Sequence, residues 1–203
     1  TFTLQLEAGI VSVHVDDSLP EQPLISMTQL KPKFMEIHDP ARVLPVFGLT
    51  PLDLAEGLQI QTVSTGTPQL MIPLRSHESL RAAAMDFDAY PVLKEESDFF
   101  SPHLFVLQGI SEDATTFARH FGLPPDTVED PFTGSATGGM ASYLWKYNLI
   151  EKPEFIAEQG HWMNRPGRAQ VRINGARDNI ESVTISGYAI DVLRGQIDVP
   201  QRD

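Results

Sequence analysis

Alternating apolar and polar positions recur along most of the chain and predict a protein built mainly of β-strands. Alternation around Ala8-Gly9 is typical of a hairpin, and Thr65-Gly66-Thr67-Pro68 has the composition of a turn between two further strands. The expected strands cover residues 2–7, 10–15, 24–30, 60–64, 69–74, 103–109, 116–121, 155–160, 169–173, 182–187 and 188–195.

Helices are indicated where a capping residue precedes a run without strand alternation. Asp39-Pro40 and Thr50-Pro51 each place an N-cap residue before a proline, and Ser76 opens a third helical segment. A proline-marked loop at 124–131 and a glycine-rich turn lead into the longest helix. The predicted helices cover about 40–46, 51–57, 76–85 and 136–149. This order of strands and helices predicts an α+β fold with an antiparallel sheet.

Composition narrows the function classes. The 203 residues carry 27 acidic and 15 basic side chains, a formal charge of −12, which argues against a protein that follows nucleic-acid phosphates. There is no apolar run near the roughly 18 residues of a membrane span, and there is no cysteine. The six histidines lack metal-ligand spacing, and no nucleotide-binding motif occurs, so we expect neither metal nor cofactor. These features predict a soluble, cytoplasmic protein whose partner is a small molecule or another protein.

The stretch from Glu129 to Gly139, EDPFTGSATGG, is the densest candidate for chemistry. Free amides at 135–137 would face an anion at the start of the long helix, where the helix dipole favours negative charge. Gly134 would let a ligand approach the backbone, and Asp130 could take or position a proton. The alternative is a plain capped helix, with Ser135 as the N-cap and Asp130 as a loop residue.

Two other polar segments permit a binding role or a simple turn. Gln159 and Arg165, in a loop between two predicted strands, could face a carboxylate ligand. The amides of residues 64–67 offer a similar opportunity. The same compositions are also typical of exposed turns, and the residue patterns leave both interpretations open.

Taken together and in order, EDPFTGSATGG, Glu158-Gln159-Gly160, Asn164-Arg165-Pro166-Gly167 and the final SGYAIDVLRGQI resemble the PhzF family of phenazine biosynthesis-like proteins. The resemblance covers nearly the whole chain. It implies the diaminopimelate epimerase-like fold, with two pseudo-symmetric halves that each wrap a curved sheet around a central helix. On that pattern residues 1–42 finish the first half, 43–185 build the second around the helix at 136–149, and 186–203 form a strand expected to cross back.

The resemblance also implies roles for single residues. Asp130 matches the active-site aspartate of the family, and Ser135 matches the serine that holds the substrate. Gly134, Ala136 and the amides around Ser135 match the cradle for the substrate carboxylate, while Thr137 stands where asparagine or histidine is frequent. Asn164 replaces the glycine common before Arg-Pro. The site residues expected from the motif are therefore Asp130 for catalysis and Gly134, Ser135, Ala136 and Thr137 for substrate binding.

The function implied is a cofactor-independent isomerase that moves a proton between carbon atoms of a small carboxylate, such as a dihydro-hydroxyanthranilate. The family's general acid/base glutamate and a Gly-His pair would precede Thr1, so we expect this chain to be the remainder of a longer protein. Without cysteines, epimerisation by two thiols is not expected. A homodimer is expected by resemblance. The alternatives are a non-catalytic small-molecule binding protein, and a subunit completed by a separate N-terminal chain.

Overall fold

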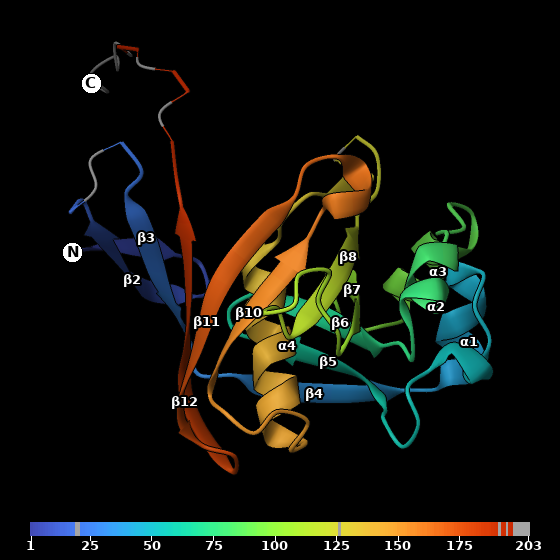
Figure 1. Ribbon diagram of the computed structural model, residues 1–203. Coiled ribbons are helices and arrows are strands. Elements are labelled where there is room, and N and C mark those ends of the chain that lie inside the picture. The colour runs from blue at the N-terminus through green and yellow to red at the C-terminus, as the bar shows by residue number, and fades with distance from the viewer. Residues whose placement is uncertain (19–20, 126, 191, 194, 197–203) are drawn as a thin grey trace, which may run out of the picture.

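A single mixed sheet runs through the molecule and curves around a central helix, α4 (Gly134–Lys146), in the computed structural model (Figure 1). The structure describes residues 1–18, 21–125, 127–190, 192–193 and 195–196. In spatial order the sheet is β1-β2-β3-β12-β11-β10-β8-β7-β6-β5-β4, and β9 pairs with β8 outside this path. The strands are β1 Phe2–Leu6, β2 Gly9–Asp16, β3 Leu24–Gln29, β4 Lys33–His38, β5 Ile60–Ser64, β6 Pro68–Pro73, β7 Ser101–Val106, β8 Thr116–Phe121, β9 Glu129–Asp130, β10 Glu154–Gln159, β11 Gly167–Ala176 and β12 Asn179–Tyr188.

Most of the predicted strands form, with three differences. β4 and the two-residue β9 were not predicted, because a bulge interrupts the alternation of β4 and β9 lies in a proline-marked loop. The strand expected over 188–195 is wrong for the described residues, since β12 ends at Tyr188 and residues 189–190, 192–193 and 195 are not in a strand. Residue 196 is likewise not in a strand, and residues 191, 194 and 197–203 of the expected 186–203 strand lie outside the described residues. Two pairings, β6 with β7 and β8 with β10, are parallel, so the sheet is mixed.

The helices are shorter than their sequence patterns suggested. The segment after Asp39 divides into α1 (Pro40–Val43) and a 3₁₀ turn, η1 (Leu44–Phe47), and the helix expected over 51–57 is only η2 (Pro51–Asp53). Their caps are as predicted: the Asp39 side chain accepts from the Ala41 amide at 2.9 Å. Ser76 caps α2 (His77–Ala82), and α3 (Ala89–Glu95) was not predicted.

Two hydrophobic clusters pack on opposite faces of the sheet. One lies between the sheet and α1–α3, the helices at the right of Figure 1, and contains Phe47, Leu80 and Tyr90. The other packs α4 against the inner face and contains Tyr143 and Val183. The middle strands β5, β6, β7 and β8 are therefore covered on both sides, and their side chains are almost all buried.

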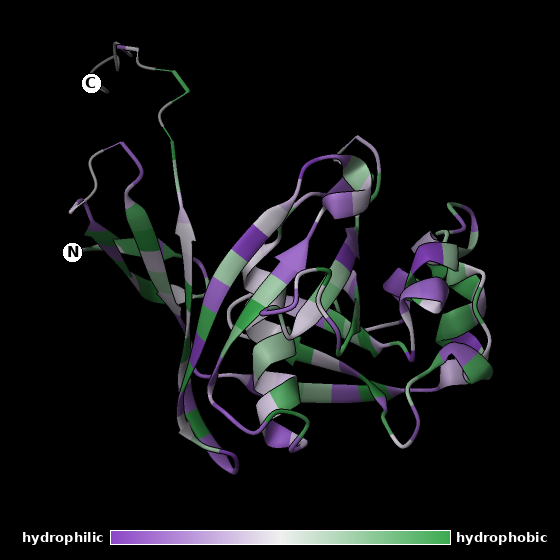
Figure 2. Ribbon diagram, in the orientation of Figure 1, coloured by the Kyte–Doolittle hydropathy of each residue, from purple (hydrophilic) through white to green (hydrophobic). Residues whose placement is uncertain are grey.

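The N-terminal hairpin joins the sheet through the last described strand, because β12 lies between β3 and β11. Hydroxyl pairs cross this join: Ser26 with Ser186 at 2.7 Å, and Thr28 with Thr184 at 3.1 Å. The sheet is thus continuous across residue 42, and the division into 1–42, 43–185 and 186–203 stays a prediction. Hydrophobic residues follow the hairpin strands, including several exposed ones on β1 (Figure 2). Among the described residues, no helix has the length and apolarity to cross a membrane.

Candidate functional site

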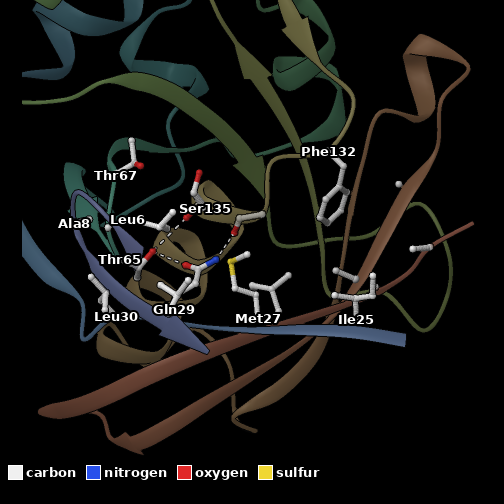
Figure 3. Close-up of a pocket in the computed structure, with 18 of the residues that line it drawn as sticks. Leu6, Ala8, Ile25, Met27, Gln29, Leu30, Thr65, Thr67, Phe132 and Ser135 are labelled. Atoms are coloured by element: carbon white, nitrogen blue, oxygen red, sulfur yellow. Dashed lines mark hydrogen bonds between the residues drawn. The ribbon is translucent and has the colours of Figure 1, made fainter. Parts of the chain in front are cut away.

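An open cavity of about 1350 Å³ lies at the N-terminal end of α4. Its walls come from the hairpin strands β1–β3, the turn at 65–67 after β5, the start of α4 and the beginning of β11 (Figure 3). Most of the lining is apolar, and the polar side chains include those of Gln29, Thr65, Thr67 and Ser135. The cavity therefore combines an apolar interior with the end of a helix, an arrangement suited to a small molecule carrying a negative group.

The first turn of α4 begins two residues earlier than predicted. Thr133 is the N-cap, in place of Ser135, and Gly134 is the first helical residue. The Thr137 amide already donates to the Thr133 carbonyl at 2.9 Å, and the Thr137 hydroxyl donates to the same oxygen. The expectation of a free amide at Thr137 is therefore wrong, and its side chain is buried.

The amides left for an anion are those of Gly134, Ser135 and Ala136, which have no hydrogen-bond acceptor within the described part of the chain. Gly134 and Ser135 line the cavity, whereas the side chain of Ala136 is fully buried. A Cβ atom at Gly134 would meet nothing within 4 Å, so this position faces open space. The unbonded amides are thus those of 134–136, one residue earlier than the predicted 135–137.

Gln29 connects the hairpin to this turn, as the dashed lines in Figure 3 show. Its Nε2 donates to the Gly134 carbonyl at 2.7 Å, and its Oε1 accepts from the Thr65 hydroxyl. The carbonyl of Gly134 and the amide of Ser135 belong to one trans peptide and point in opposite directions. Gln29 therefore fixes the direction of the Ser135 amide.

The close approach of Gln29 depends on a glycine one turn further along the helix. A Cβ atom on Gly138 would lie 1.9 Å from Gln29 Oε1 and 2.6 Å from its Cδ. On the other side, Gln69 Nε2 lies 3.4 Å from the Ser135 hydroxyl and Gln69 Oε1 accepts from Ser101. Neither Gln29 nor Gln69 was singled out from the sequence, and Thr65 was considered only for its main-chain amide; the glycine pair at 138–139 signals a close approach but does not name its partner.

Asp130 lies beside the cavity without lining it. Its Oδ2 accepts from the Thr133 hydroxyl at 2.6 Å, and its main-chain carbonyl accepts from Gln159 Nε2 at 2.6 Å. Gln159 Oε1 in turn accepts from the Thr133 amide at 3.2 Å. Gln159 is 2% exposed and does not line the cavity, so neither of the two interpretations left open for it, a ligand contact or an exposed turn, describes it: it holds the loop that carries Asp130.

The two charged side chains in the lining are Glu7 and Arg168. Arg168 forms ion pairs with Asp113 and with Glu158, whose Oε1 lies 3.4 Å from Arg168 Nη1. Burial alone would raise the pKa of Glu158, but hydrogen bonds from the Ser111 side chain and from two amides lower it overall. Arg165 is exposed and does not line the cavity, so of the neighbouring arginines only Arg168 reaches it.

The loop around Arg165 has a tight backbone, which explains its glycines. Gly160 has φ 83°, and a Cβ there would lie 2.5 Å from the Pro131 carbonyl oxygen. Asn164 has φ 56°, a conformation that asparagine tolerates better than most residues, and this accounts for its presence in place of glycine. These residues pack the loop against the segment that carries Asp130.

Away from the cavity, Glu36, His38 and Asp98 come together with their ligand atoms within 4.8 Å of one another. The histidines show no metal-ligand spacing in the sequence, yet Glu36 and His38 are two residues apart on β4 and the fold brings Asp98 to them. His38 Nε2 is already 2.8 Å from the Thr62 hydroxyl and 3.3 Å from Asp98 Oδ1. Nε2 of the buried His38 is thus occupied by these contacts, while Glu36 is exposed, Asp98 is half-buried, and Asp98 Oδ1 has no hydrogen-bond donor among the described residues.

The family model for phenazine biosynthesis-like proteins (PhzC-PhzF) matches residues 1–195. The chain is 30% identical over 192 residues to the uncharacterized isomerase YfhB of Bacillus subtilis, covering 94% of this chain and 65% of that protein. It is 30% identical over 183 residues to the uncharacterized isomerase YddE of Escherichia coli, covering 85% of this chain and 60% of that one. The chain thus spans less than two thirds of the length of these relatives.

Solved structures resemble the fold described above. A PhzF-family phenazine biosynthesis protein from Bacillus anthracis superposes with a TM-score of 0.77 at 26% identity, covering 95% of this chain and 68% of that one. A predicted epimerase from Pseudomonas aeruginosa gives a TM-score of 0.75 at 26% identity, covering 98% of this chain and 67% of that one. These similarities confirm the α+β fold of the diaminopimelate epimerase-like class.

Proposed function

The chain belongs to the family of phenazine biosynthesis-like proteins, and from that premise we propose that it forms the carboxylate-binding part of a cofactor-independent isomerase. The isomerase would remove a proton from one carbon of a small carboxylate and return it to another, with no net change in composition. The relatives YfhB and YddE are both named as uncharacterized isomerases, which supports this reaction class. The observation that carries the proposal is the row of unbonded amides at 134–136, in a helix start whose Gly134 and Ser135 line an open, largely apolar cavity.

The substrate carboxylate would bind the amides of Ser135 and Ala136, with the Ser135 hydroxyl as a further partner. The helix dipole and the unsatisfied amides both favour an anion at this point. The apolar walls, including Met27 and Phe132, suit a hydrocarbon ring or chain and exclude water from it. A dihydro-hydroxyanthranilate has this combination of a carboxylate and a carbon ring.

Asp130 would assist the proton transfer from the side of the cavity. Thr133 binds one carboxylate oxygen, which leaves the other for a proton or a substrate atom. The main base would be the glutamate that the family resemblance implies outside these residues. A positioned acid or base contributes about 10²–10⁴-fold to rate.

Binding is tested first, with anthranilate as the probe and its neutral amide, anthranilamide, as the matched control. We expect anthranilate to shift the NMR amide signals of Gly134, Ser135 and Ala136, and anthranilamide to leave them unchanged. Equal shifts with both compounds, or none with either, would contradict carboxylate binding at this helix.

Turnover is tested with 2,3-dihydro-3-hydroxyanthranilate in D₂O, following deuterium incorporation by NMR. Asp130→Asn should lower the rate by about 10²-fold or more, while Asp88→Asn, on an exposed residue next to α3, should not change it. Wild-type turnover in Asp130→Asn with intact binding would remove Asp130 from the catalytic role.

The alternative of a non-catalytic binding protein also has an observation in its favour, since Asp130 does not line the cavity. A binding protein would bind anthranilate at 134–136 and show no deuterium incorporation, even after addition of a separately encoded chain that supplies the missing half. Activity that appears only with such a chain would instead identify a two-chain enzyme.

A further inference from the structure

Two buried histidines stand in one row with Asp130, and nothing above assigns them a role. His103 on β7 lies directly opposite His120 on β8, and His120 lies directly opposite Asp130 on β9. Side chains of directly opposed residues on antiparallel strands share one face, with Cβ atoms about 5 Å apart. The three side chains therefore form a cross-strand row that ends at the proposed catalytic aspartate.

The neighbours of this row along the strands point to the other face. Arg119 precedes His120, Glu129 precedes Asp130, and the two pair with each other at 2.8 and 2.9 Å. Arg119 also donates to carbonyls at the end of α2, on the outer side of the sheet. On the inner face, the ionisable side chains of β7, β8 and β9 are therefore His103, His120 and Asp130.

The two histidines bind each other through their Nδ1 atoms, which are 3.3 Å apart. His103 is fully buried and His120 is 6% exposed. Burial lowers the pKa of His103 well below its usual range and that of His120 to about 4, although the charge of Asp130 acts in the opposite direction on His120. Both rings are therefore neutral at pH 7, and each carries one proton.

A hydrogen bond between two Nδ1 atoms requires that one is protonated and the other is not. If His120 were the donor, the proton of His103 would sit on its Nε2, which is buried and has no partner among the described residues. A buried N–H without an acceptor is costlier and rarer than a buried acceptor without a donor. The favoured arrangement protonates His103 on Nδ1 and leaves the proton of His120 on Nε2.

The negative charge of Asp130 also favours the tautomer of His120 that is protonated on Nε2. A carboxylate stabilises a neighbouring N–H dipole, and hydrogen-bond partners set which ring nitrogen of a histidine is protonated. Since Nδ1 of His120 is turned to β7, the Nε2–H is the donor left outside the pair.

We propose that His120 is a positioning residue for Asp130: His103 holds it in the Nε2–H tautomer, and the dipole of this N–H favours one orientation of the Asp130 carboxylate from the opposing strand, without a hydrogen bond or ion pair between the two side chains in the described residues. The Thr133 hydroxyl holds Asp130 Oδ2, and His120 acts on the carboxylate from the sheet side. This role rests on the proposed function of Asp130, but the arrangement of the row can be measured without substrate.

The first test is the ¹⁵N NMR spectrum of the imidazole rings of the 203-residue chain at pH 7. We expect two neutral rings, His103 protonated on Nδ1 and His120 protonated on Nε2. In His103→Leu the partner is lost, and His120 should then populate both tautomers. A charged His120, or His120 protonated on Nδ1 in the wild type, would overturn the proposal.

The second test compares the side-chain rotamers of Asp130, read from NMR couplings, in His120→Gln and His120→Leu. Glutamine retains an N–H donor near the Nε2 position and should keep the single Asp130 rotamer of the wild type, whereas leucine should give an average of several. His14→Gln, on an exposed histidine of β2, is the control. An Asp130 rotamer that is unchanged in a folded His120→Leu would overturn the proposal, whether or not the chain proves to be an isomerase.

Discussion

Replacement of Gly138 by alanine tests whether Gln29 holds the start of α4. Alanine normally stabilises a helix interior by about 1 kcal/mol relative to glycine. Here the new Cβ would lie 1.9 Å from Gln29 Oε1, so the Gln29 side chain must leave. Two hydrogen bonds are lost, to Gly134 and from Thr65, at about 1 kcal/mol each, and the abandoned buried groups cost about 1–3 kcal/mol more. We expect a net loss of about 2–4 kcal/mol.

The assay is a double-mutant cycle by urea unfolding, followed through tryptophan fluorescence. In a Gln29→Ala background the Cβ added at position 138 no longer meets the amide group of residue 29, so Gly138→Ala should become stabilising by about 1 kcal/mol. Gly139→Ala is the control, since its Cβ would meet only the flexible tip of Met71 at 3.0 Å and the Val63 carbonyl oxygen at 3.4 Å. If Gly138→Ala has the same effect in both backgrounds, the two residues are not coupled and the reasoning is refuted.

Other substitutions test the supports of the site one at a time. Gln159→Leu should destabilise the chain by about 2–4 kcal/mol in urea unfolding, because the 130–133 turn loses its buried partners; a loss below about 0.5 kcal/mol would contradict this. Gly167→Ala puts a Cβ 2.5 Å from the Phe132 ring, so we expect weaker anthranilate binding by titration, and unchanged affinity would show that the ring is free to move. Burial lowers the pKa of His120 to about 4 in the folded state, against about 6.5 in the unfolded state. The contribution of the neutral ring to the free energy of unfolding is therefore complete above pH 6.5 and is lost as the pH falls through 4. Between pH 7 and 4 the wild type should lose about 3 kcal/mol more than His120→Gln, and parallel stability curves would disprove the shift.

The local signals in the sequence were reliable where a single element determines the outcome. Ser76 and Asp39 act as N-caps, and the alternation over 116–121 corresponds to β8. The helix predicted over 51–57 shrank to one turn, because Leu54 is already extended and pairs with Leu74 in an antiparallel bridge. Capping chemistry marks where a helix starts, whereas tertiary contacts decide how far it continues.

In the candidate site, too, local sequence patterns located the helix start but not the long-range contacts that hold it. The motif located the start of α4, and the glycine at 134 faces open space as expected. Gln29, 105 residues before Gly134, could not be found, because glutamine on a strand has many uses and the contact is long-range. Thr137 was misplaced by two helical positions, since the N-cap is Thr133 in place of Ser135 and sequence patterns set helix boundaries only to within a few residues.

The hydroxyl-paired join between β3 and β12 has a consequence for biosynthesis. Thr28 and its partner Thr184 are 156 residues apart, so at about 5–20 residues per second the first strands wait roughly 8–30 s for the strand that completes their sheet. During that interval the edge of β3 is unpaired on the nascent chain. The hairpin strands are therefore incorporated long after they are synthesised, and the wall they contribute to the cavity is assembled only once β12 has been translated.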